Sequence, residues 1–199
     1  MKKEFKLSIL MVIMFTVMLS NVNANNFILL NKEFKKTTLT LNNVKKGQRL
    51  LIKDNQGLVL YKEFIQVEGT YFKGFDLTAL PNGSYFFELD KDVEIKIIPF
   101  TVNSNEVTFN KEKETSIFKP FVRVKDNKLL ISQLSLELKP LSIKVYQENN
   151  SSSDYLLYSE TVENTKKIER IYSLPVKTRE SYRIVFKTEG REFVEYINI

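Results

Sequence analysis

The sequence contains no cysteine, no histidine and no tryptophan, and only six glycines among its 199 residues. These absences exclude catalytic triads that use histidine, cysteine nucleophiles, and zinc or haem sites built from imidazole or thiolate ligands. The scattered glycines form no phosphate-binding loop. A glycosidase with two carboxylates is still allowed, but general acid–base catalysis without histidine needs a specially buried carboxylate pair. The acidic residues here fall at expected turn or outward positions, so we expect no enzymatic activity and no cofactor.

Long hydrophobic runs are also absent. The longest, at residues 7–19, is shorter than the roughly 20 apolar residues that a transmembrane helix needs. It follows basic residues within positions 2–6 and precedes Val22 and Ala24, small residues that suit a signal-peptide cleavage site. We therefore predict a signal peptide at residues 1–24 and an exported chain, located in the periplasm, at the cell surface or outside the cell. An uncleaved membrane anchor is the alternative interpretation.

Positive charge is not concentrated in any one segment. The predicted signal peptide holds three lysines and one glutamate, so its removal lowers the formal net charge from +6 to +4. Lysine pairs occur at 35–36, 45–46 and 166–167, in or beside expected turns and edge strands, where lysine discourages edge-to-edge pairing. A nucleic-acid-binding protein carries a concentrated basic patch. We therefore predict no nucleic-acid partner, and no transmembrane segment in the exported chain.

The dominant pattern is an apolar/polar alternation with a period of two, which is typical of half-buried β-strands. Hydrophobic residues make up 43% of the chain, with 15 Phe and 9 Tyr, which is enough for cores without disulfides. Turn signals, such as residues 54–57 and 81–83, separate the alternating segments. Strands are predicted at residues 27–30, 37–41, 49–53, 58–67, 70–77, 84–89, 93–102, 106–109, 121–124, 128–134, 141–147, 155–162, 167–172, 182–187 and 192–199.

The two halves of the chain resemble each other when the sequence is shifted by 97 positions. The matched positions pair Leu60 with Leu157, Tyr61 with Tyr158, Glu63 with Glu160, Phe75 with Tyr172, Leu77 with Leu174, and Tyr85 with Tyr182. Such self-similarity indicates two tandem copies of one unit. About seven short strands per copy, with closely spaced turns, are typical of an immunoglobulin-like sandwich. We predict an all-β protein with two tandem immunoglobulin-like antiparallel β-sandwich domains.

The expected domains are residues 25–102 and a second, diverged copy at residues 103–199. The boundary is placed at Asn103 to Asn105, where a long strand ends in small polar residues. The pleat of the strands also predicts which side chains face the core. These are Tyr85, Phe87 and Leu89 on one strand, Val93, Ile95 and Ile97 on the next, and Tyr182, Ile184 and Phe186 in the second copy.

The segment from Leu50 to Val102 resembles a known family. A hairpin strand that ends in Tyr61 is followed by Asp76-Leu77-Thr78-Ala79-Leu80-Pro81-Asn82-Gly83-Ser84-Tyr85. This pattern is similar to the small β-sandwich sorting domains of Bacteroidetes type IX secretion cargo and to related short secreted immunoglobulin-like families. The resemblance implies a sandwich fold and export in a Bacteroidetes-like bacterium. The second copy departs from the pattern, since it has no glycine before Tyr182.

Four acidic residues alternate through one predicted hairpin tip. They are Glu88, Asp90, Asp92 and Glu94. Calcium prefers oxygen ligands that gather on a loop, so these residues are a candidate calcium site. An ordinary solvated turn, with Lys91 at its middle, is the simpler interpretation.

Four aromatic residues form a second candidate site. Phe72, Phe86, Tyr155 and Tyr158 are expected on outward positions, where an aromatic strip can bind a sugar or a partner protein. Because Tyr158 corresponds to Tyr61 in the repeat, packing between the sheets is the alternative for this residue.

Together these features favour an exported, non-enzymatic structural or binding module of the bacterial envelope or surface, with an adhesion-like role. We expect a protein or cell-surface partner, reached through exposed edge strands by strand addition. A second hypothesis is type IX secretion cargo whose C-terminal half is a removable sorting signal. A third is a carbohydrate-binding accessory protein. Retention or loss of the C-terminal half during export distinguishes the first hypothesis from the second.

Overall fold

The computed structural model describes residues 28–31, 36–149, 153–175 and 180–199. The predicted signal peptide lies outside these ranges. The regular structure of the described residues consists of β-strands and two short 3-10 helices, η2 (Leu77–Ala79) and η3 (Lys111–Lys113). None of the helices in this part of the chain is long and apolar enough to cross a membrane. The all-β class predicted from the sequence is confirmed.

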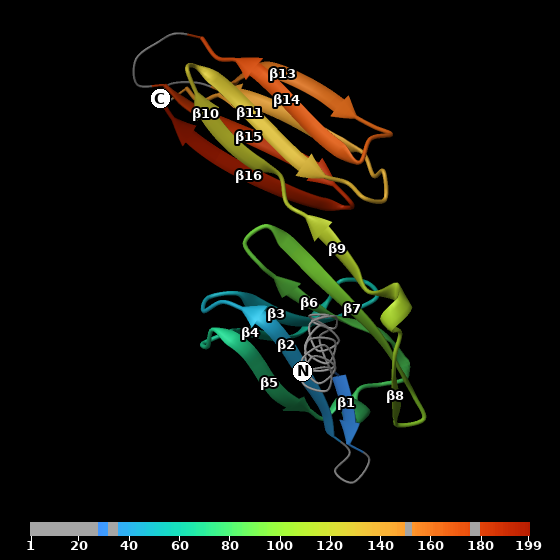
Figure 1. Ribbon diagram of the computed structural model, residues 1–199. Coiled ribbons are helices and arrows are strands. Elements are labelled where there is room, and N and C mark those ends of the chain that lie inside the picture. Colours follow the sequence, from blue (N-terminus) through green and yellow to red (C-terminus); the bar gives the residue numbers. More distant parts are fainter. Residues whose placement is uncertain (1–27, 32–35, 150–152, 176–179) are drawn as a thin grey trace, which may run out of the picture.

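The strands form two bodies along the chain, with β9 leading from one to the other (Figure 1). The first body contains β1 (Ile28–Asn31), β2 (Lys36–Val44), β3 (Arg49–Asp54), β4 (Val59–Phe64), β5 (Gly69–Phe75), β6 (Gly83–Asp90), β7 (Glu94–Asn103), β8 (Glu106–Phe109) and β9 (Thr115–Phe118). The second contains β10 (Phe121–Lys125), β11 (Lys128–Leu134), β12 (Leu141–Gln147), β13 (Tyr155–Val162), β14 (Lys167–Ser173), β15 (Ser181–Thr188) and β16 (Arg191–Asn198). We call these bodies the first and the second sandwich.

The first sandwich consists of two antiparallel sheets around one core. The smaller sheet has the order β1-β2-β5, and the larger has the order β4-β3-β6-β7-β8, with β9 also paired to β7. Leu39 and Leu41 from the smaller sheet pack with Leu50, Phe87 and Phe100 from the larger one. The predicted inward positions on β6 are confirmed, since these alternate residues are buried in this core.

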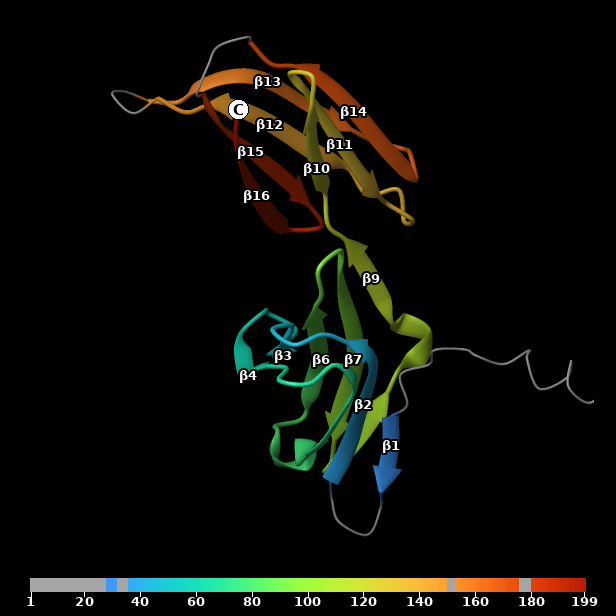
Figure 2. The ribbon, with the colours of Figure 1, turned by 60° about the vertical axis from the view of Figure 1, so that its left-hand side comes forward.

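The second sandwich repeats this strand order. The sheet β10-β11-β14 faces the sheet β13-β12-β15-β16 (Figure 2). An irregularity in pairing occurs at the equivalent place in both copies, between Ile52 and Lys53 and between Val145 and Tyr146. The second sandwich therefore has a three-stranded sheet that faces a four-stranded sheet. This arrangement agrees with the predicted tandem β-sandwich fold.

In each copy, a tyrosine near the start of β6 or of the equivalent strand β15 bonds to the backbone of the connection that precedes the strand. The Tyr85 hydroxyl donates a hydrogen bond to the carbonyl oxygen of Pro81 at 2.8 Å, and Tyr182 donates to that of Pro175 at 3.3 Å. Immunoglobulin-like sandwiches have a tyrosine corner at this place. Gly83 permits the tighter first corner, because a Cβ there would lie 3.3 Å from the Tyr85 hydroxyl oxygen. The second copy has no glycine before its tyrosine, and its tyrosine reaches a carbonyl further upstream.

The predicted orientation of β7 is wrong. Ile98 and Phe100 face the core, whereas Ile95 and Ile97 lie on the outer face of the sheet. Val93 precedes the strand and is 64% exposed. The alternation misleads because β7 is apolar on both faces. On the outer face, Ile117 of the neighbouring strand β9 lies beside Ile95.

The expected domain boundary at residues 103–105 coincides with a tight turn inside the first sandwich. Ser104 and Asn105 have positive φ values of 49° and 64°, and they connect β7 to β8. Both β8 and β9 then pair with β7. The division of the chain into domains stays a prediction. We propose that it lies between β9 and β10, at Lys119–Pro120.

Candidate functional site

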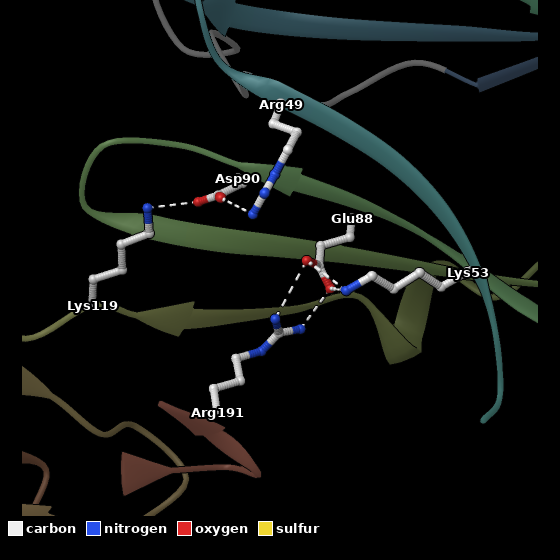
Figure 3. Close-up of polar contacts among 6 residues, drawn as sticks. All are labelled: Arg49, Lys53, Glu88, Asp90, Lys119 and Arg191. Atoms are coloured by element: carbon white, nitrogen blue, oxygen red, sulfur yellow. Dashed lines mark hydrogen bonds and ion pairs between the residues drawn. The ribbon is translucent and has the colours of Figure 1, made fainter. Parts of the chain in front are cut away.

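A group of charged side chains lies where the second sandwich meets the first. On β6, Phe87 and Leu89 point into the core, so Glu88 and Asp90 project from the outer face of the sheet. Four basic side chains from separate parts of the chain converge on these two acids (Figure 3). We call the six residues Arg49, Lys53, Glu88, Asp90, Lys119 and Arg191 the charged junction.

Glu88 is the most buried member of the junction, with 1% of its side chain exposed. It accepts hydrogen bonds from Lys53 Nζ at 3.0 Å, and from Arg191 Nη2 at 2.6 Å and Nη1 at 3.3 Å. Burial alone would raise the pKa of Glu88, but the hydrogen bonds from Arg191 and Lys53 outweigh burial and leave the pKa lowered. The ionised carboxylate therefore joins the start of β16 to the first sandwich.

Asp90 forms the second centre of the junction. Its Oδ2 lies 2.7 Å from Nη2 of Arg49, which is its directly opposed residue on β3. Its Oδ1 lies 2.6 Å from Nζ of Lys119, in the segment between β9 and β10. The two acids of β6 are thus held by bases from β3, from the connecting segment and from the second sandwich.

Neutral contacts accompany these ion pairs. Gln133 Nε2 on β11 donates a hydrogen bond to the carbonyl oxygen of Phe118 at 2.7 Å. Leu51, Ile95 and Ile117 are no more than 5% exposed, although they belong to neither sandwich core. They share the outer sheet face with the two acids of β6. The apolar side chains on this face are therefore buried and not exposed for binding.

The four predicted calcium ligands each pair with a basic residue. Glu88 and Asp90 belong to the charged junction, Asp92 lies 2.6 Å from Lys45, and Glu94 lies 3.3 Å from Lys91. The described residues hold no group of three or more metal-ligating side chains that could bind a metal ion. The calcium site stays a prediction, and the neutralisation of each acid by the chain's own bases disfavours it.

The four predicted aromatic residues are not brought together. Phe72 on β5 is 68% exposed and Tyr155 on β13 is 58% exposed, and these strands belong to different sandwiches. Phe86 is half-buried on the larger sheet of the first sandwich. Tyr158 packs against the second core, with its ring centroid 4.8 Å from that of Tyr172. A continuous aromatic strip is therefore disfavoured. Tyr158 packs between the sheets, as the alternative interpretation of this residue expected.

Each sandwich also has an ion pair that links its two sheets. Glu63 on β4 pairs with Lys73 on β5, and Glu160 on β13 accepts hydrogen bonds from Arg170 Nε on β14, at 3.1 Å to each oxygen. In both copies the acid lies on one edge strand and the base on the facing edge strand. The two pairs are separated by 97 positions in the sequence, the spacing of the repeat.

A tyrosine hydroxyl donates a hydrogen bond to each of these carboxylates, from Tyr61 to Glu63 and from Tyr172 to Glu160. Burial alone would raise the pKa of both glutamates, but the hydrogen bonds from their basic and tyrosine partners leave it lowered. The acids are therefore ionised, and the ion pairs close the same side of both sandwiches.

The sequence reasoning did not identify Arg191 or Lys119 as functionally placed. Arg191 and Glu88 are 103 positions apart, so no local spacing connects them. The sequence signal for these bases is the pair of acids at outward positions of β6. Acids that become buried or half-buried need basic partners nearby.

Comparisons with known proteins add little to this geometry. No family model matches the chain, and no curated protein matches it in sequence. Among solved structures, the chain is similar to one described as "Biofilm associated protein - BSP domain". The identity is 12% and the TM-score is 0.30, over 85% of this chain and 28% of that one. This chain thus spans less than a third of that chain's length. The resemblance to type IX sorting domains stays a prediction.

Proposed function

We propose that the protein is an exported, non-enzymatic structural or binding module that contacts protein partners at the bacterial envelope or surface. The observation that carries the proposal is the charged junction, in which Glu88 and Arg191 join the two sandwiches. Such a junction presents the two sandwiches as one extended unit. The edge strands of both, such as β4, β13 and β16, lie at the ends of their sheets and are open to strand addition.

The acids of the charged junction and of the two ion pairs between sheets favour a role without catalysis. The buried or half-buried carboxylates of Glu63, Glu88, Asp90 and Glu160 are all engaged with basic side chains. The pKa values of Glu63, Glu88 and Glu160 are lowered. A general acid needs a raised pKa, so these carboxylates are unsuited to glycoside hydrolysis.

The junction also bears on the alternative that the C-terminal half is a removable sorting signal. Loss of that half would remove Arg191 from Glu88 and Gln133 from the carbonyl oxygen of Phe118. Both contacts join the second sandwich to the first. We therefore favour retention of the second sandwich in the exported protein.

Intact-mass measurement of the protein from periplasm, cell surface and medium tests the proposal. We expect a species that begins at Asn25 and ends at Ile199. A surface or medium species that ends between residues 103 and 120 would support the cargo hypothesis instead. Retention on polysaccharide that Tyr155→Ala abolishes would support the carbohydrate-binding hypothesis.

A further inference from the structure

The two sandwiches differ at one sheet edge. In the first, β7 is covered along its outer edge by β9, which pairs with residues 94–97, and by β8, which pairs with residues 100–103. The equivalent strand of the second sandwich is β16. Within the described ranges, β16 pairs with β15 alone, so its other edge carries no strand.

The core-facing side of β16 carries a charge between two apolar residues. The register places Phe193, Glu195 and Ile197 opposite Phe186, Ile184 and Tyr182 of β15. These three β15 residues are fully buried, and both apolar residues of β16 pack against the same core. Glu195 is exposed, and no base among the described residues forms an ion pair with it. The open edge thus presents an unmatched carboxylate.

Core-facing charges near other sheet edges are matched. Glu63 and Glu160 are matched by Lys73 and Arg170 from the facing edge strands. In the first sandwich, the segment that covers the edge of β7 supplies the opposite charge for a core-facing lysine of β7. Glu114, directly before β9, lies 3.1 Å from Lys96, which faces the core side of β7. A strand added to a sheet edge in this protein therefore supplies the counter-charge.

We propose that the free edge of β16 binds an extended strand of a partner protein, with Lys or Arg opposite Glu195 and an apolar residue two positions away on each side. This proposal rests on the proposed function and names its binding surface. The chain's own bases have the same surroundings, because Lys73 lies between Tyr71 and Phe75, and Arg170 between Ile168 and Tyr172. Added strands gain affinity from main-chain hydrogen bonds and specificity from alternate side chains.

The other edges and a second copy of the chain fit less well. The edge strands β4 and β13 carry their inward acids already paired. By contrast, β16 contains no lysine and no proline, residues that commonly guard edges, and its one base, Arg191, is held by Glu88. A second β16 would have to supply Arg191, the one base on the core-facing side of this strand, and Glu88 already holds that base. We therefore assign the partner strand to another protein.

Binding of two synthetic peptides, followed by amide chemical shifts of the purified protein, tests the proposal. One peptide is Thr-Thr-Val-Thr-Lys-Thr-Val-Thr-Thr, and the other has Glu in place of Lys. We expect the lysine peptide to shift the amides of β16 selectively and to bind about tenfold more tightly than the glutamate peptide, which corresponds to about 1.4 kcal/mol. Glu195→Gln should remove this preference and Glu195→Lys should reverse it.

Glu192→Gln is the matched control, because Glu192 lies on the same strand but pairs with the exposed Lys187. This variant should keep the preference for lysine. Equal binding of the two peptides, or shifts concentrated on β4 or β13, would overturn the proposal. So would a dimer of the protein alone with the edge of β16 occupied. None of these results would change the intact mass of the exported species, so failure of the β16 site is distinguishable from failure of the proposed function.

Discussion

Arg191 of the second sandwich and Glu88 of the first form a bidentate contact across 103 positions of sequence. Lys53 binds the same carboxylate from within the first sandwich. One acid thus receives a base from its own sheet and a base from the neighbouring body. Removing the acid therefore affects both the stability of the first sandwich and its connection to the second.

Glu88→Gln tests this contact directly. The amide keeps the shape of the side chain but removes the negative charge between two bases that are 17% and 23% exposed. We expect the free energy of unfolding to fall by about 1–3 kcal/mol, because two charge-assisted hydrogen bonds are weakened at a buried site. Urea denaturation measures the change. Glu192→Gln is the control, since the side chains of its ion pair are exposed, Lys187 at 63% and Glu192 at 52%. This variant should change stability by less than about 0.5 kcal/mol. Equal losses in the two variants would contradict a special role for Glu88.

The junction should also weaken in acid. The pKa of Glu88 is lowered from its ordinary value of 4.5, since the hydrogen bonds from Arg191 and Lys53 outweigh burial. A lowered pKa contributes stability above the unfolded-state pKa, and this contribution is lost as the pH falls through the folded-state pKa. We therefore expect the difference in stability between the wild type and Glu88→Gln to shrink as the pH falls below about 4.5. Urea titrations at a series of pH values measure it. A difference that is independent of pH would show that the carboxylate's charge does not stabilise the junction.

The two tyrosine corners allow a comparison within one molecule. Tyr85→Phe removes a hydroxyl that donates to Pro81 at 2.8 Å, and Tyr182→Phe removes one that donates to Pro175 at 3.3 Å. The first substitution should lower the free energy of unfolding by about 1 kcal/mol, and the second by less, because hydrogen bonds weaken with distance. Thermal or urea unfolding of each variant measures the losses. A larger loss for Tyr182→Phe would reverse this order.

The sequence predicts elements better than it predicts their partners. The strand at residues 155–162 has the predicted bounds, because polar segments flank Tyr155 and Val162 on both sides. The short strand β9 was missed, since only Ile117 of its four residues is buried. The orientation of β7 was misjudged because apolar side chains line both faces of that strand, and period-two alternation cannot then distinguish inside from outside.

The candidate sites were harder to predict for a similar reason. The acidic residues of the hairpin tip were recognised as a cluster, and in the structure each of them pairs with a basic side chain of the protein. Lys53 is 35 positions from Glu88 and reaches it through strand pairing. Arg191 reaches it only through the packing of one sandwich on the other. Such partners follow from tertiary structure and leave no local pattern in the sequence.

The ion pair between Glu160 and Arg170 should be replaceable by its reverse. Each side chain is about a third exposed, with values of 34% and 37%, so the pair should contribute no more than about 1 kcal/mol. Glu160→Arg alone places two bases together beside Tyr172, and Arg170→Glu alone places two acids there. Each single change should therefore lower the free energy of unfolding by more than the loss of one ion pair.

The double variant should recover most of that loss, because opposite charges again face each other between β13 and β14. A double-mutant cycle in urea measures the coupling. Additive losses in the double variant would mean that packing of these long side chains, and not their charge, closes this side of the sandwich.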